Sequence, residues 1–367
     1  MKYSNDKRIV MTLDAGGTNF VFSAIQSNKE IVEPVTLLSN GANLKLCLDT
    51  IVEGFTKIKE KLADSPCAIS FAFPGPCDYP NGIIGDLENL PGFRGGIALG
   101  PMLREIFEIP VYLNNDGDLF TYGEALGGFL PEINEKLRQA GSPKQYKNLF
   151  GITLGTGFGG GIVRNGELFI GDNSSAGEIW ITRNKVTPRC YAEEGVSIRA
   201  IQRVYNENAK VKPEDALSPK EIYEIATGKA DGDKDAALKS FDEMAEIVGD
   251  ALANAITLID GLIVIGGGLS GAAPLFMPRI VKELNSTIES IDGNKLTRLD
   301  SISFNLEDEN ELKSFIKGKT KKITVPGTNK TLSYDPMKRI GIGLSKLGTN
   351  HAVSIGAYAF ALNELDR

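Results

Sequence analysis

The chain has 367 residues, of which 42% are hydrophobic and 24% are charged, a composition typical of a folded globular protein of two domains. Its formal net charge of −7 argues against a nucleic acid partner, because an acidic chain does not attract a phosphate backbone. Four cysteines without CxxC spacing indicate a reducing compartment. We recognise no signal peptide and no membrane span, so we expect a cytoplasmic protein without a membrane partner.

The first part of the chain alternates apolar strands with polar turns. We expect strands at residues 8–14, 20–25, 68–73 and 110–116, and an amphipathic helix at residues 42–62. The first strand ends in Asp14 and runs into the turn DAGGTN. This order of elements is typical of an α/β domain.

The segment LNNDGD places Asn115 and Asp116 at the carboxyl end of a strand. Open α/β sheets bind their ligands at this end, and an aspartate there can accept a hydroxyl proton as a general base. The alternative is that these polar residues only cap the following helix, and Asp118 is then the favoured N-cap.

The second part of the chain repeats the opening pattern and adds helices. We expect strands at residues 148–154, 162–170 and 262–268, a helix opened by the Ser218 capping box, a long helix at 234–258, a hairpin near 320–335 and a closing helix at 352–363. Asn165-Gly166 is the two-residue signal for a primed hairpin turn.

A strand, a glycine-rich turn and a second strand occur at residues 8–25 and again at 148–170. Both turns, AGGTN and LGTGFGG, carry glycine and threonine at the tip. Glycine lets backbone N–H groups approach a phosphate closely, and threonine adds a hydroxyl donor. Two such halves facing one another across a cleft would hold a polyphosphate.

Two segments match the pattern GxGxxG of dinucleotide-binding proteins. GTGFGGG at 155–161 precedes a hairpin instead of the helix that this motif requires. GGGLSG at 266–271 follows a strand and could open a helix, so an oxidoreductase remains an alternative. His351 is the single histidine, which excludes a Ser-His-Asp triad and a histidine-based zinc centre.

Several motifs in order resemble the ROK family of bacterial sugar kinases and related repressors, within the actin-like ATPase superfamily. They are LDAGGTN at 13–19, FPGPCD at 73–78, ENLPGF at 88–93, NNDGD at 114–118, LGTGFGGGIVRNGELFIG at 154–171, AGEI at 176–179, VIGGGLS at 264–270 and GAYAFAL at 356–362. The resemblance covers nearly the whole chain. It implies two RNase H-like α/β domains around a cleft, which we place at residues 1–118 with 350–367 and at residues 119–349.

The resemblance also implies a role for each motif. ATP phosphates would contact Gly16, Gly17, Thr18 and Asn19 in the first turn, and Gly155, Thr156 and Gly157 in the second. Gly267 and Gly268 would pack on the adenosine, and Asp14 would hold Mg2+ through water. Asp116 would be the catalytic base, and the sugar would also contact Asn115, Glu178, Glu193, Gly75 and Asn89, with Glu194 as an alternative to Glu193.

The segment at 174–195 departs from the family pattern. Family glucokinases continue GEIGH into a cluster of three cysteines that binds zinc with that histidine, whereas this chain has Trp180 and Ile181 after GEI, and of the cysteines only Cys190. One cysteine cannot build a four-coordinate zinc site, so we expect no structural zinc. We expect apolar packing of Trp180 and Ile181 to hold the segment instead.

The expected function is an ATP-dependent hexose kinase that uses Mg2+, with glucose as the first-choice sugar. Fructose and the N-acetylhexosamines (N-acetylmannosamine and N-acetylglucosamine) are alternative substrates. A non-catalytic sugar sensor of the repressor branch is an alternative of another class, but residues 1–7 leave no room for a DNA-binding domain before the first strand. The expected partners are the hexose and ATP, with a homodimer as a candidate assembly.

Overall fold

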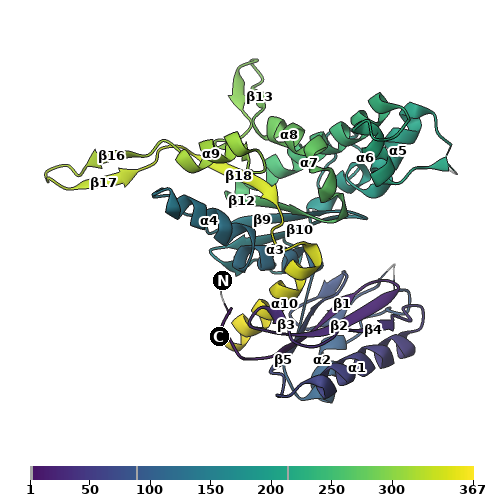
Figure 1. Ribbon diagram of the computed structural model, residues 1–367. Coiled ribbons are helices and arrows are strands. Elements are labelled where there is room, and N and C mark those ends of the chain that lie inside the picture. Colours follow the sequence, from purple (N-terminus) through teal and green to yellow (C-terminus); the bar gives the residue numbers. More distant parts are fainter. Residues whose placement is uncertain (1–2, 88–89, 213–214) are drawn as a thin grey trace. The chain divides into compact units, whose positions relative to one another are not determined.

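The computed structural model describes residues 3–87, 90–212 and 215–367 (Figure 1). The chain divides into two compact units. Unit 1 contains residues 1–131, 161–177 and 346–367, and unit 2 contains residues 132–160 and 178–345. These units are defined by contacts within the chain. The predicted domains, with a boundary at residues 118/119, stay a prediction.

Unit 1 is built on a mixed sheet with the strand order β3-β2-β1-β5-β8, and β4 pairs with β2. The strands are β1 (Val10–Ala15), β2 (Asn19–Gln26), β3 (Lys29–Glu30), β4 (Val35–Leu38), β5 (Ala68–Ala72) and β8 (Val111–Asn114), and β6 (Cys77–Asp78) pairs with β7 (Ile83–Ile84) in a separate hairpin. Strands β1, β5 and β8 are parallel, whereas β2 runs antiparallel to β1. The parallel strands therefore end at one edge of the sheet.

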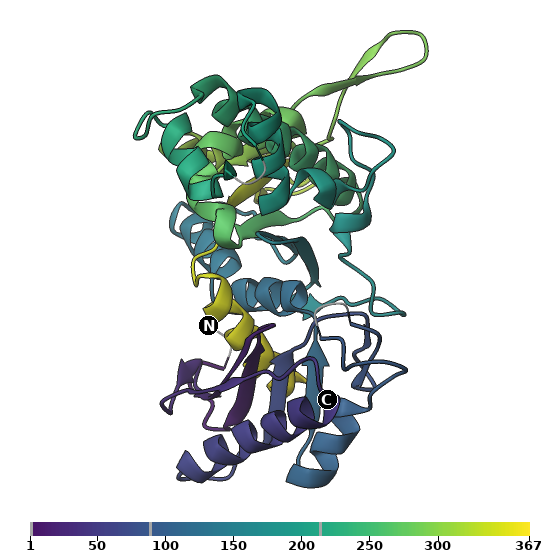
Figure 2. The same ribbon diagram turned by 90° about the vertical axis from the view of Figure 1, so that its right-hand side faces the viewer.

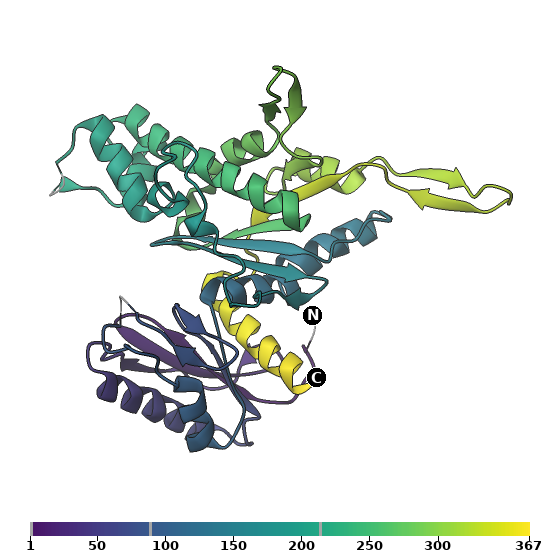
Figure 3. The same ribbon diagram turned by 180° about the vertical axis from the view of Figure 1, so that it is seen from behind.

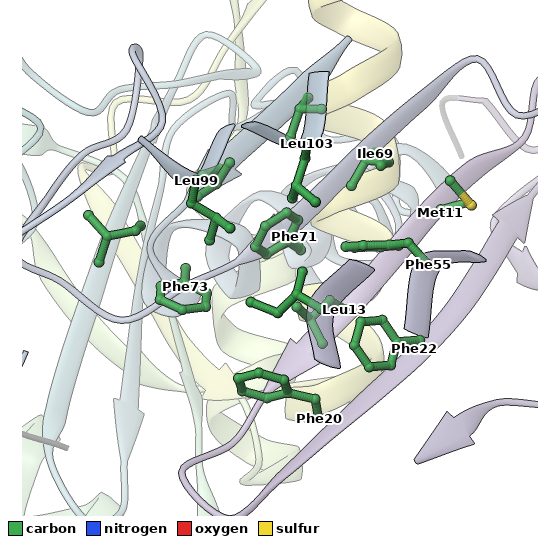
Figure 4. Close-up of a cluster of buried hydrophobic side chains, with 14 of the residues drawn as sticks. Met11, Leu13, Phe20, Phe22, Phe55, Ile69, Phe71, Phe73, Leu99 and Leu103 are labelled. Atoms are coloured by element: carbon green, nitrogen blue, oxygen red, sulfur yellow. The ribbon is translucent and has the colours of Figure 1, made fainter. Parts of the chain in front are cut away.

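The core of unit 1 lies on both faces of this sheet. Its helices are α1 (Leu44–Lys61), α2 (Leu99–Phe107), α3 (Asp116–Leu126) and α10 (Thr349–Leu365). Met11 belongs to the cluster that includes residues of α1 and α2, while its neighbour Val10 packs with residues of α10 on the opposite face. Phe71 packs against the rings of Phe55 and Phe73 in the first cluster (Figure 4).

Two glycines let α3 and α10 pack with their backbones in contact. A Cβ atom at Gly123 would lie 2.0 Å from the Ala352 carbonyl oxygen, and one at Gly356 would lie 2.0 Å from the Leu119 carbonyl oxygen. No larger residue fits at either position without moving a helix. This contact holds α3, whose first residue is Asp116, against the C-terminal helix.

The second sheet has the order β11-β10-β9-β12-β18-β15. Its strands are β9 (Leu149–Leu154), β10 (Phe158–Arg164), β11 (Glu167–Leu168), β12 (Leu262–Gly266), β15 (Ile302–Asn305) and β18 (Arg339–Leu344). Strand β12 is parallel to both β9 and β18, and β15 is parallel to β18. Asn165 and Gly166 both have positive φ, as a primed turn between β10 and β11 requires.

The remaining helices are α4 (Phe129–Gln139), α5 (Ile198–Ala209), α6 (Pro219–Ala226), α7 (Lys234–Ile259), α8 (Ala273–Leu284) and α9 (Glu309–Lys317). Helices α5, α6 and α7 pack against one another (Figure 2). The predicted capping box is confirmed, since Ser218 and Glu221 exchange hydrogen bonds at the start of α6. In the described ranges, no helix combines the length and apolar character needed to cross a bilayer.

Two short hairpins extend unit 2. Strands β16 (Lys321–Thr324) and β17 (Thr331–Tyr334) form the projecting hairpin near residues 320–335 (Figure 3). Every residue of both strands is exposed. Strands β13 (Thr287–Glu289) and β14 (Lys295–Thr297) form the other.

Candidate active site

The parallel strands of unit 1 bring several predicted site residues to one edge of the sheet. Asp14 of β1 is in register with Ala72 of β5, which is in register with Asn114 of β8. Asn115 and Asp116 follow directly after β8. Asp14 and Asp116 therefore lie at the carboxyl ends of strands of the same sheet, the place where open α/β sheets bind ligands.

Asn115 is the N-cap of α3, and the expectation that Asp118 caps this helix is wrong. The Asn115 Oδ1 accepts a hydrogen bond from the Gly117 N–H at 2.8 Å. Asp118 is 3% exposed and lies inside the first helical turn. The helix begins earlier than predicted because β8 ends at Asn114, so Asp116 already has helical geometry.

The two aspartates at this edge are not neutralised by cations. In the described part of the chain, neither Asp14 nor Asp116 has an ion-pair partner. The Asp14 side chain reaches solvent, yet the protein packed around it raises its pKa, and the nearby Asp116 carboxylate raises that pKa further. The Asp116 side chain reaches solvent, yet the protein packed around it raises its pKa, against the opposing effect of the hydrogen bond from Gly117 N–H. Both carboxylates are thus held in a state that favours proton or cation binding.

Tyr79 supports this edge, and the sequence motifs do not single it out. Its hydroxyl donates to the Phe73 carbonyl oxygen at 3.0 Å and accepts from the Asn115 Nδ2 at 3.5 Å. A Cβ atom at Gly75 would lie 3.2 Å from the same hydroxyl. Burial raises the pKa of Tyr79, so the hydroxyl stays protonated. Tyr79 therefore links the FPGP turn that holds Gly75 to Asn115.

The first glycine turn, at Gly16–Thr18, connects β1 to β2, and Asn19 begins β2. These residues are exposed, and a Cβ atom at Gly17 would meet nothing within 4 Å. Ser39 fixes the turn by two hydrogen bonds. Its hydroxyl donates to the Gly17 carbonyl oxygen at 2.6 Å, and its N–H donates to the Thr18 carbonyl oxygen at 2.9 Å. Both bonds use carbonyl oxygens of the turn as acceptors, so they do not occupy its N–H groups. Sequence motifs gave no signal for Ser39.

In unit 2 the second glycine turn lies beside the GGG segment. Gly155, Thr156 and Gly157 connect β9 to β10, and Gly267 and Gly268 follow β12, the strand that pairs with β9. A Cβ atom at Gly155 would lie 3.9 Å from the Gly268 nitrogen. Gly267 has φ +90°, and a Cβ there would lie 2.3 Å from the Leu154 carbonyl oxygen. The two glycine segments thus form one backbone surface.

Glu193 contacts the second glycine turn. It lies in the short helix η2 (Ala192–Gly195), and its Oε2 accepts from the Phe158 N–H at 2.9 Å. A Cβ atom at Gly157 would lie 2.8 Å from the same oxygen. The Arg199 guanidinium is 3.6 Å from the other carboxylate oxygen. One of the predicted sugar-binding glutamates is therefore connected to the predicted phosphate turn.

Glu178 precedes the short helix η1 (Ile179–Ile181) and is exposed. The Trp180 indole N–H donates to its Oε2, and the indole packs edge-to-face on Tyr191. Trp180 thus packs as expected, whereas the expected packing of Ile181 is wrong, because this side chain is 61% exposed.

Polar contacts hold the rest of the segment that follows Glu178. Asn184 is 3% exposed, and its Oδ1 accepts from the N–H groups of Val186 and Thr187. Lys185 forms ion pairs with Glu283 at 2.5 Å and Glu246 at 3.1 Å. Burial alone would lower the pKa of Lys185, but these carboxylates outweigh it and raise that pKa. Hydrogen bonds and ion pairs therefore anchor this segment to α7 and α8.

Asn89, a predicted sugar contact, lies outside the described residues. Among the residues described, no three His, Cys, Asp or Glu side chains gather in a group suited to a metal ion.

A protein-family comparison matches residues 10–309 to the ROK family. The chain belongs to the ROK family. Over 291 residues it is 31% identical to a glucokinase from Halalkalibacterium halodurans, a match that covers 73% of this chain and 82% of that protein. It is also 28% identical over 301 residues to an N-acetyl-D-glucosamine kinase from Photobacterium profundum, covering 75% and 90%.

Among solved structures, this ROK protein is similar to a glucokinase from Parabacteroides distasonis. The TM-score is 0.92 at 55% identity, and the match covers 99% of each chain. The predicted fold class, an α/β protein with two RNase H-like domains of the actin-like ATPase type, is confirmed by the family and these neighbours.

Proposed function

We propose that this ROK protein is an ATP-dependent sugar kinase of the glucokinase type, with glucose as its substrate. The observation that carries the proposal is the 55% identity, over 99% of both chains, to a glucokinase of the same fold. The arrangement of Asp14, Asn115 and Asp116 at the ends of parallel strands supports it.

In unit 1, Asp116 is the general base that accepts the proton of the attacking sugar hydroxyl. A carboxylate with a raised pKa is suited to this task, since a base is most efficient when its pKa approaches the working pH. Asn115, held by Tyr79, and the backbone at Gly75 contact the sugar. Asn89 lies outside the described residues, and its sugar contact is proposed from the family motif only.

The two glycine segments are suited to ATP. The open space at Gly17 and at Gly268, where a Cβ atom would meet nothing within 4 Å, leaves room for a ligand against the backbone. Gly16 to Asn19 and Gly155 to Gly157 bind the phosphates, while Gly267 and Gly268 lie against the adenosine. Asp14, an exposed carboxylate, holds Mg2+ through water, and the ion neutralises charge on the phosphates.

In unit 2, Glu178 and Glu193 accept hydrogen bonds from sugar hydroxyls. Glu193 is preferred to Glu194, because the Glu194 Oε1 already accepts from the Tyr191 hydroxyl at 3.0 Å and its main-chain oxygen accepts from Arg203. A carboxylate has lone pairs for several donors, so the contact of Glu193 with Phe158 still leaves it able to bind a hydroxyl.

N-acetylglucosamine is the second candidate substrate. The specific observation that favours it is the 28% identity to an N-acetyl-D-glucosamine kinase over 75% of this chain. An N-acetyl group at carbon 2 is bulkier than a hydroxyl, so N-acetylglucosamine needs more space at this carbon than glucose does.

We also propose that the protein holds no structural zinc and that it acts in the cytoplasm. The zinc proposal rests on the replacement of the family's histidine and cysteines by residues such as Ile181. Stoichiometric zinc in purified protein, measured by mass spectrometry, would refute it. The candidate homodimer stays a prediction that light scattering can decide.

A coupled ADP-release assay over glucose, mannose, fructose, N-acetylglucosamine and N-acetylmannosamine tests the proposed function. We expect turnover of glucose to have the highest kcat/KM. Turnover confined to N-acetylglucosamine would establish the second candidate instead. No turnover with any of the five sugars would sink the proposed activity.

A further inference from the structure

Trp180 is the single tryptophan of the chain. Its indole N–H donates to the Glu178 Oε2. Glu178 itself is exposed, so the packing of a core does not fix its carboxylate. In the described part of the structure, the indole is the one side chain that donates to this carboxylate.

The indole is in turn held in place. Trp180 and Tyr191 pack edge-to-face with ring centroids 5.6 Å apart and an interplanar angle of 89°. The Tyr191 hydroxyl donates to the Glu194 Oε1 at 3.0 Å, and Arg203 of α5 donates to the Glu194 carbonyl oxygen at 2.8 Å. The ring pair therefore joins Glu178 to a helix-anchored glutamate on the other side of the segment.

Backbone bonds close the segment between the two rings. The Ala192 N–H donates to the Thr182 carbonyl at 2.8 Å, and the Asn184 N–H donates to the Cys190 carbonyl at 3.0 Å. The two rings thus come from the two sides of a closed loop. A shift of Tyr191 would move Trp180, and with it the Glu178 carboxylate.

We propose that Trp180 is a positioning residue for the sugar. Its indole N–H holds one oxygen of Glu178, so that the other oxygen faces the ligand in a preset orientation. This inference rests on the proposed function. The neighbouring Ile181 is 61% exposed and has no polar group to orient Glu178.

Preset orientation strengthens binding because Glu178 then loses less side-chain freedom when the sugar arrives. From the usual cost of immobilising one side chain, the gain in sugar affinity is roughly 3- to 10-fold. Chemistry at Asp116 is not involved, so the gain belongs to sugar binding and not to the catalytic step.

The variant Trp180→Phe keeps an aromatic ring against Tyr191 and removes the N–H donor. We expect it to raise the glucose KM and the calorimetric Kd for glucose roughly 3- to 10-fold, while kcat and the ATP KM stay within about 2-fold. Tyr334→Phe, on the projecting hairpin, is the matched control and should change none of these values. An unchanged glucose Kd in Trp180→Phe overturns the proposal.

A double-mutant cycle with Glu178→Ala asks whether Trp180 acts through Glu178. In the Glu178→Ala background, Trp180→Phe should have no further effect on glucose binding. Additive losses would overturn the proposal, because Trp180 would then act by another route.

The variant Tyr191→Phe keeps the ring pair and removes the hydrogen bond to Glu194. We therefore expect a smaller rise in glucose KM than in Trp180→Phe. A larger rise than in Trp180→Phe would count against the proposal.

Failure of the proposed function has a different signature. If the wild-type protein phosphorylates none of the five sugars, the sugar kinase proposal fails before any variant is made. If the wild-type protein is active and Trp180→Phe behaves like it, only the positioning role fails. The sugar with the highest wild-type kcat/KM is used for all variants.

Discussion

The carboxylates of the two units are held in different ways. In unit 1, Asp14 and Asp116 lie at the carboxyl ends of strands of one sheet, have no ion-pair partner among the described residues, and both have raised pKa values. In unit 2, Glu178 and Glu193 each accept a hydrogen bond from a defined donor. The difference agrees with the roles that we propose, namely chemistry at Asp14 and Asp116 and sugar binding at Glu178 and Glu193.

The proposed roles would account for this difference. A base or a metal-binding group must gain a proton or a cation during the reaction, so a permanent cationic partner would compete with that event. A group that only receives hydroxyl hydrogen bonds benefits from a fixed orientation and tolerates a permanent donor. Substitutions that remove charge or remove a donor should therefore act differently in the two units.

Asp116→Asn is expected to have the largest effect. It keeps the size of the side chain and removes the base, so kcat should fall roughly 10²- to 10⁴-fold while the sugar Kd changes little. Steady-state rates and sugar calorimetry measure the two quantities. Asp49→Asn, on the exposed face of α1, is the charge-matched control. A rate within a few-fold of wild type would remove Asp116 from its proposed role.

Asp14→Asn comes second and should act on the metal ion. If Asp14 holds Mg2+ through water, its loss should weaken apparent Mg2+ affinity by about 10- to 100-fold, the usual range for an outer ligand. The rate measured against free Mg2+ at saturating ATP should then recover in part at high Mg2+. An unchanged Mg2+ dependence would show that the ion is bound elsewhere.

Glu193→Ala tests the most specific contact of unit 2. This change removes the acceptor of the Phe158 N–H, so the turn at Gly155–Gly157 loses a support and the sugar loses a contact. We expect both the ATP KM and the sugar KM to rise, each roughly 10-fold, because a charge-assisted hydrogen bond at a partly exposed position is lost. Glu194→Ala is the neighbouring control and should leave the ATP KM unchanged. If only the sugar KM rises, Glu193 contributes to sugar binding and not to ATP binding.

Features that rest on local chemistry were predictable from the sequence. The capping box at Ser218 follows from hydrogen bonds within four residues, and the alternation at Val10 and Met11 follows from the pleat of a strand. The cap of α3 was not predictable in this way, since Asn115 takes this place only because β8 ends at Asn114, two residues earlier than expected.

Contacts between segments that are distant in the sequence could not be predicted either, because they depend on how the chain folds back on itself. The bond from Phe158 to Glu193 joins residues 35 positions apart, and Tyr79 reaches Asn115 across 36 positions. Motifs place residues along the chain and do not specify which side chain meets which turn. The roles of the site residues stay predictions until the variants are measured.

The smallest expected effect concerns stability, and it again separates the units. An aspartate whose folded-state pKa is raised above its unfolded value of about 3.9 destabilises the folded protein at neutral pH, and this cost disappears as the pH falls below that value. Asp116→Asn should therefore raise Tm at pH 7 slightly, and the gain should shrink as the pH is lowered toward 4.

Removal of the Asp116 charge should also lower the raised pKa of Asp14, since the two carboxylates repel one another. Glu178→Gln in unit 2 is the contrasting variant, because its carboxylate has a donor and its loss should bring no such gain. Thermal shift measured from pH 4 to pH 8 compares the two. A lower Tm for Asp116→Asn than for wild type at pH 7 would mean that Asp116 supports the start of α3 more than its charge opposes folding.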